Sequence, residues 1–134
     1  MTGITAQLWA FWGQFTLNGT PIPAYQAGAV PEDAAFPYIT FDAAQGAALD
    51  VIPLAAIVWV KQEAENSSTA IAQRMAVLEA VSKAIPEGGT RLDLDDGFMV
   101  LRRGSGDFLS SLTDEEDPTV LGGRVGYEVT FYTT

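Results

Sequence analysis

The stretch that decides the fold runs from residue 57 to residue 85 and reads IVWVKQEAENSSTAIAQRMAVLEAVSKAI. Residues 56–63 predict a strand whose first part is apolar on both faces, with Ile57 and Trp59 on one and Val58 and Val60 on the other. Such a strand is typical of the centre of a sheet. Residues 68–85 then predict a helix that ends at a proline. Its expected buried stripe is Ile71, Met75, Leu78, Val81 and Ile85.

Further strands are predicted on both sides of this stretch. Residues 38–42 are rich in β-branched and aromatic types, and residues 90–94 and 98–103 read as a hairpin joined at Asp95-Asp96-Gly97. The last strand alternates in a period of two. We expect its core side chains to be Val125, Tyr127, Val129 and Phe131, and its outward side chains to be Arg124, Glu128, Thr130 and Tyr132.

The N-terminal segment predicts a second helix, because apolar residues recur on one helical face. These residues are Ile4, Leu8, Phe11, Trp12 and Phe15. Three connections are expected to be loops. Residues 19–37 form a long segment rich in Gly, Pro and Ala, Gly46 and Pro53 bracket a second loop, and residues 104–120 form a polar third one.

The expected order is helix, strand, strand, helix, hairpin and strand. Strands that are segregated from two helices are typical of an α+β fold. We therefore expect residues 1–134 to form a single domain, with a mostly antiparallel β-sheet of about four to five strands and two helices packed on one face.

The composition limits the classes of function. Seven basic and seventeen acidic residues give a formal net charge of −10, which should repel DNA, RNA and anionic membranes. No apolar run approaches the ~20 residues of a membrane span, and the N-terminus lacks the positive start of a signal peptide. We expect a soluble intracellular protein. The chain has neither cysteine nor histidine, so thiol chemistry and the commonest general base are absent.

Two acidic clusters are the only candidates for chemistry. They are the pair Asp95 and Asp96, and the run Asp114, Glu115, Glu116 and Asp117. Carboxylate pairs can act as acid and base, but both clusters fall in predicted turns, where acidic side chains are usually just solvated. The glycines around residues 93–104 do not fit the register of a calcium loop. Nucleophile, phosphate-loop and dinucleotide motifs are also missing. We expect no enzyme, no cofactor and no metal.

Two features suggest assembly. Trp9 lies more than 100° from the apolar face of its predicted helix, so either the 19–37 loop covers it or it lies in a subunit interface. Ala72, Ala76 and Ala80 form a ridge of small side chains opposite the predicted stripe of the later helix. Helix propensity explains this ridge more simply than the close approach of a neighbouring chain does.

Three passages together resemble one protein family. They are IPAYQAGAVPEDAAFPYITFD at 22–42, the opening stretch at 57–85, and DEEDPTVLGGRVGYEVTFYTT at 114–134. Their order and spacing are similar to those of the siphophage tail-terminator proteins, also called tail-completion, minor tail or minor capsid proteins. The resemblance implies a hexameric ring that is assembled in the host cytoplasm and caps the tail tube at the head-proximal end of the virion tail. Its partners would be further copies of itself, the tail tube protein and the head connector protein.

A ring on the path of the genome must let DNA pass without binding it. Six copies at −10 would carry a formal charge of −60, so some acidity is expected near the lumen. Asp114, Glu115, Glu116 and Asp117, or the Asp95-Asp96 turn, are candidates to supply it. These residues could equally be solvated loops on the outer rim or docking loops for the connector.

Two other functions stay open. One is a head-completion or connector protein, which would share the size and the acidity. The other is a small acidic enzyme or ligand-binding domain. A ring in solution separates the virion classes from the last one, for which a monomer with a saturable small-molecule site is expected.

Overall fold

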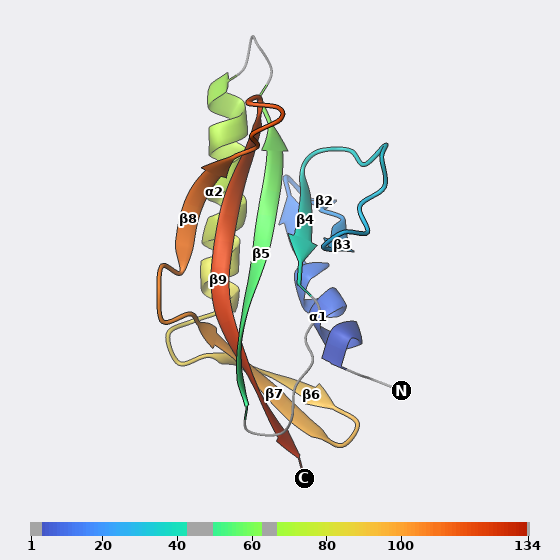
Figure 1. Cartoon of the computed structure of the whole chain (residues 1–134), viewed down its shortest axis with the longest axis vertical. Coiled ribbons are helices and arrows are strands. Elements are labelled where there is room, and N and C mark those ends of the chain that lie inside the picture. Colours follow the sequence, from blue (N-terminus) through green and yellow to red (C-terminus); the bar gives the residue numbers. More distant parts are fainter. Residues whose placement is uncertain (1–3, 43–49, 63–66, 134) are drawn as a thin grey trace.

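The computed structural model describes residues 4–42, 50–62 and 67–133. Its elements are α1 (Ile4–Trp12), β1 (Thr16–Leu17), β2 (Thr20–Pro21), β3 (Ala24–Gln26), β4 (Tyr38–Phe41), β5 (Val51–Lys61), α2 (Ser67–Ala84), β6 (Thr90–Leu94), β7 (Gly97–Arg103), β8 (Leu109–Thr113) and β9 (Val120–Thr133). The α+β class is confirmed (Figure 1).

The main sheet is larger than expected. It has seven strands instead of four to five, in the order β3-β4-β5-β9-β7-β6, with β8 pairing with β9 beyond the end of β7. All pairs are antiparallel except β3 with β4. The long β5–β9 ladder, from Val51↔Thr130 to Lys61↔Val120, forms its centre. A separate two-stranded hairpin joins β1 to β2.

The extra strands come from segments that were expected to be loops. The 19–37 connection contains β2 and β3, and the 104–120 connection contains β8. Pro53 does not bracket a loop but lies inside β5, while Gly46 and residue 63 lie outside the described residues. The other predicted strands are confirmed, including the hairpin of β6 and β7. The first helix ends at Trp12, so Phe15 is buried without being helical.

Both helices lie on the same face of the sheet. That face carries the predicted core residues of β9, since Val125, Tyr127, Val129 and Phe131 are all at most 4% exposed. The Trp12 ring of α1 contacts the Tyr127 ring, and α2 lies behind β8 and β9 (Figure 1). Thr130 projects from the opposite face, as expected, but neighbouring strands leave it only 6% exposed.

The buried stripe of α2 differs from the expected one. Val81 and Ile85 are buried and Leu78 packs against the core. Ile71 and Met75, however, are exposed, and Ala70 and Val77 take the inner positions. Gly123 of β9 explains this orientation, because a Cβ there would lie 2.8 Å from Leu78 Cδ1 and 3.1 Å from Arg74 Cγ. The helix therefore sits close to the strand where Leu78 and Arg74 pack over Gly123, and Ile71 and Met75 turn outward.

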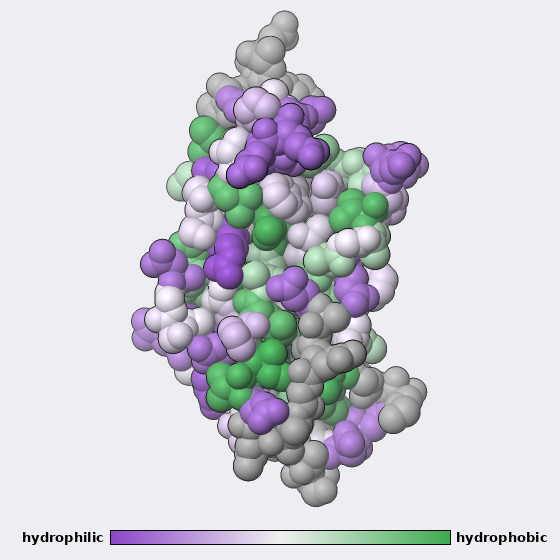
Figure 2. Space-filling view, viewed as in Figure 1, coloured by the Kyte–Doolittle hydropathy of each residue, from purple (hydrophilic) through white to green (hydrophobic). Residues whose placement is uncertain are grey.

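The sheet face opposite the helices is not covered by a described helix. Figure 2 looks onto this face, where polar and apolar side chains are interleaved. Side chains of adjacent strands cover one another here. The rings of Phe98 and Tyr132 stack at 4.9 Å, and the Arg91 guanidinium lies 3.9 Å from the centre of the Phe98 ring.

Candidate interaction surfaces

An apolar exposed surface lies along α2. Met75 is 63% exposed and Ile71 41%, and Leu109 of β8, at 37%, lies beside them. Met75 and Leu109, together with neighbouring side chains, border an open groove of about 550 Å³. We name it the α2 groove, and its lining is Ala72, Met75, Ala76, Leu78, Glu79 and Leu109. Most of this lining is apolar, which is unusual for a surface that only meets water.

The alanine ridge is divided by the observed orientation of α2. Ala72 and Ala76 are exposed and line the α2 groove. Ala80 instead is partly buried and packs against the core. The small side chains of the first two leave the groove hollow between Met75 and Glu79, where a larger side chain of another molecule could enter.

Trp9 forms a second apolar surface. Its side chain is 50% exposed, and its ring meets Phe41 edge-on, with centroids 6.1 Å apart. The 19–37 segment therefore does not bury it. A half-exposed tryptophan that is anchored on one side and open on the other has the form of an interface residue, since tryptophan is enriched among residues that dominate binding energy.

These two surfaces are formed by different elements. In Figure 1, α1 lies to the right of the β5–β9 ladder, whereas α2 and β8 lie to its left. Trp9 packs against Phe41 of β4 and the α2 groove includes Leu109 of β8, so the two apolar surfaces lie at opposite edges of the sheet. Sequence reasoning identified Trp9 but placed Met75 and Ile71 in the core. The signal that it missed is the width of the apolar arc on α2, which includes both Ala70 and Met75.

The structure does not bring the two acidic clusters together. Asp114, Glu115, Glu116 and Asp117 form the turn between β8 and β9, at the upper end of the long axis, and Asp95 and Asp96 form the β6–β7 turn near the lower end (Figure 1). They therefore cannot act as one paired-carboxylate site, because such a site needs its carboxyl groups within about 5–10 Å.

Two aspartates stabilise the β8–β9 turn. Asp114 Oδ1 accepts a hydrogen bond of 2.8 Å from the Glu116 amide. Asp117 Oδ1 accepts bonds from the Thr119 amide (3.0 Å) and the Thr119 hydroxyl (2.6 Å). The hydroxyl bond, followed by the amide bond, lowers the pKa of Asp117, because both bonds favour its charged form. Glu115 and Glu116 are exposed and leave their carboxylates to solvent.

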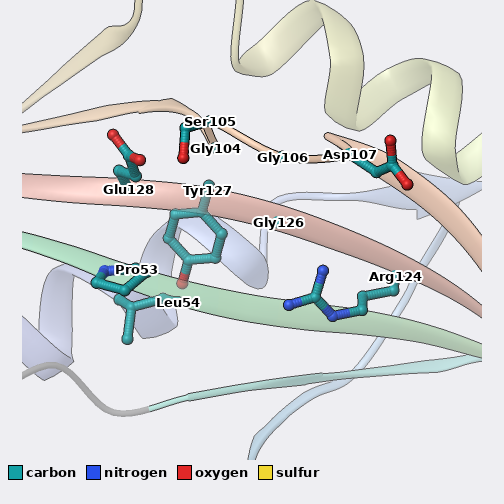
Figure 3. A pocket seen from close by; sticks show the side chains of 10 residues that line it. All are labelled: Pro53, Leu54, Gly104, Ser105, Gly106, Asp107, Arg124, Gly126, Tyr127 and Glu128. Atoms are coloured by element: carbon teal, nitrogen blue, oxygen red, sulfur yellow. The ribbon is translucent and has the colours of Figure 1, made fainter.

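A small hollow lies on the helix-free sheet face (Figure 3). Residues 104–108 bulge out between β7 and β8, and Gly126 holds both ends, accepting a bond from the Gly104 amide and donating one to the Phe108 carbonyl. Arg124, Asp107 and Glu128 lie around the hollow, whose volume is about 160 Å³. Ligand pockets usually measure roughly 300–1,000 Å³, so this hollow is small for a substrate.

Within the described residues, neither a metal-binding cluster nor a membrane-spanning helix is found. Among those residues, no three His, Cys, Asp or Glu side chains are grouped so that they could hold a metal ion. None of the described helices is long and apolar enough to cross a membrane. No protein-family model matches the chain, and neither a curated protein nor a solved structure is detectably similar to it.

Proposed function

We propose that this chain is a structural subunit without catalytic activity, which assembles into a ring at the head-proximal end of the tail of a long-tailed phage. The ring would terminate the tail tube and join the tail to the head connector. The single observation that carries this proposal is the pair of apolar surfaces at opposite edges of the sheet, around Trp9 beside β4 and along the α2 groove beside β8.

A ring requires this arrangement. In a cyclic assembly with head-to-tail contacts, every copy uses one surface toward the preceding copy and a different one toward the next. A subunit with one apolar surface could form only a symmetric dimer through it. Two unlike surfaces at opposite edges allow copies to add one after another in a row. The row closes into a ring when the rotation between neighbouring copies is a whole fraction of 360°.

The specific place of this ring in the virion is supported by the resemblance of residues 22–42, 57–85 and 114–134 to tail-terminator proteins. The α+β class, with two helices on one sheet face, agrees with the fold that this resemblance implies. The high acidity also fits a component that DNA must pass without binding, because phosphates and carboxylates repel each other.

Light scattering and negative-stain electron microscopy of the purified protein test the proposal. We expect a concentration-dependent, ring-shaped hexamer. In the virion, particles that lack the protein should accumulate as separate heads and tails. A strict monomer at every concentration that saturably binds a small molecule would instead support the ligand-binding or enzyme class and overturn the proposal.

A further inference from the structure

The charge of the chain is unevenly distributed. Residues 4–31, which include α1, β1, β2 and β3, contain no charged side chain. The helix α2 contains two basic residues, Arg74 and Lys83, and one acidic residue, Glu79, so its net charge is +1 in a chain of −10. The remaining sixteen acidic and five basic residues, with a net charge of −11, all lie outside these two segments.

This distribution decides which surfaces of two copies can approach each other. Two molecules at −10 repel, and at physiological salt this repulsion is effective over ~8–10 Å. A contact between two acidic surfaces would add a cost for every close pair of carboxylates. A contact between the uncharged N-terminal segment and α2 avoids that cost, because the one charged residue that lines the groove, Glu79, is paired with Lys83. These are also the segments that carry the two apolar surfaces, Trp9 and the α2 groove.

We propose that Trp9 of one copy docks into the α2 groove of the next copy, an inference that rests on the proposed ring and identifies its interface. The exposed part of the Trp9 ring would enter the hollow above Ala72 and Ala76 and be flanked by Met75 and Leu109. A tryptophan enclosed in an apolar groove is typical of the centre of a strong interface. Because Trp9 lies beside β4 and the groove beside β8, at opposite edges of the sheet in each copy, the contact is head-to-tail.

The absence of cysteine makes this contact directly testable by disulfide trapping. Ala10 is exposed beside Trp9, and Ala76 is exposed in the groove, so Ala10→Cys and Ala76→Cys should both fold normally. The two single variants are mixed and oxidised, with a tag on one of them to separate the products on a gel. The mixed disulfide joins position 10 of one copy to position 76 of another. We expect it to form well above the fraction that random pairing of the two variants would give. The double variant should give a ladder of linked copies that ends at the ring size.

A matched control uses Gly106→Cys in place of Ala76→Cys. Gly106 is exposed on the helix-free sheet face, and a Cβ there meets no other atom within 4 Å. Its mixture with Ala10→Cys should give only statistical cross-links. Equal or preferred same-variant disulfides in the first mixture would overturn the docking, as would no cross-link at all.

The result separates the docking from the proposed function. Rings in electron microscopy without the mixed disulfide would leave the ring in place and overturn the Trp9–groove contact. A mixed disulfide from a protein that never forms rings would support the contact and overturn the ring. A monomer without any cross-link would overturn both.

Discussion

The indole nitrogen of Trp12 donates a hydrogen bond of 3.2 Å to the phenol oxygen of Tyr127, which lies 115 residues away in the chain. Both side chains are at most 1% exposed, and their ring centroids are 5.4 Å apart. The bond joins the first helix to the middle of the last strand. It also gives each polar atom a partner in an otherwise apolar core, which matters because an unpaired buried donor is costly.

Replacing Tyr127 by Phe should therefore destabilise the fold. The substitution keeps the ring and leaves the Trp12 N–H without its acceptor, at a cost of about 1–3 kcal/mol. Urea unfolding followed by tryptophan fluorescence measures the change. Tyr132→Phe is the matched control, since that side chain is partly exposed and stacks on Phe98. Equal stabilities of the two variants would mean that the Trp12–Tyr127 bond contributes nothing.

The same residue predicts a loss of stability in alkali. Burial raises the pKa of Tyr127, while the bond from Trp12 lowers it by a smaller amount. The folded state therefore holds this proton more tightly than the unfolded state, in which the pKa is about 10. The stabilisation is complete below that value and is lost as the pH rises above it. In an ultraviolet titration, one of the four tyrosines should ionise only on unfolding. Tyr127→Phe should remove that late step.

Phe131→Ala should be among the most damaging changes in the core. Phe131 is 4% exposed and faces the helices together with Val129 and Tyr127. Deleting its ring leaves a cavity, for which the expected loss is about 3–5 kcal/mol. Thermal unfolding measures it. Val51→Ala removes a side chain that is 59% exposed, so it should change the stability by less than about 0.5 kcal/mol. An unchanged melting temperature for Phe131→Ala would be incompatible with this core.

The elements with strong periodicity could be predicted from the sequence. In β9 the alternation of Val125, Tyr127, Val129 and Phe131 identified the core face, because a strand half-buried in a sheet must alternate. The helix α2 was found within one residue at each end. Such patterns are local consequences of burying one face, so they are readable without knowing the neighbouring elements.

The extra strands form by pairing with other strands, so the local sequence pattern alone does not predict them. The strand β8 reads LSSLT, which is polar enough to look like a loop, and it forms because β9 extends past the end of β7 and offers free backbone groups. Pro53 lacks an amide hydrogen, yet it is tolerated in β5 because β4 pairs with β5 only from Ala56 to Trp59 in the described residues. Neither fact is visible in the local pattern.

The candidate site was only half predictable for a similar reason. Trp9 could be found, because its angle on a short helix separates it from Leu8 and Phe11. Met75 could not, because α2 has apolar residues over an arc wider than one face. Gly123, far away in the last strand, leaves room for Leu78 and Arg74 on the inner side of the helix, and Met75 then faces outward.

Trp9→Ser should weaken assembly much more than folding. Half of the side chain is already exposed, so the fold loses little, whereas a central interface tryptophan is typically worth about 2 kcal/mol or more, or about 30-fold in the dissociation constant. Met75→Lys should act similarly from the groove side. Light scattering against concentration measures the shift. Val51→Ser, exposed but remote from both surfaces, is the control and should assemble like the wild type. Assembly of Trp9→Ser at wild-type concentrations would remove Trp9 from the interface.

The two acidic turns lie at opposite ends of the molecule, so they make different predictions for DNA passage. Asp114 and Asp117 hold the β8–β9 turn through hydrogen bonds, and replacing them would change its shape as well as its charge. Glu115→Lys together with Glu116→Lys changes only the exposed charge. The net charge goes from −10 to −6 per copy, because each replacement adds two.

If this turn faces the lumen of the proposed ring, the new lysines bind phosphates and slow the passage of the genome, since each neutralised phosphate adds affinity. We expect intact virions with reduced DNA delivery. The comparison is Asp95→Lys with Asp96→Lys at the other end, which should then deliver DNA normally. Normal delivery by the Glu115 and Glu116 variant would exclude this turn from the lumen, and heads that no longer join tails would assign it to the connector surface.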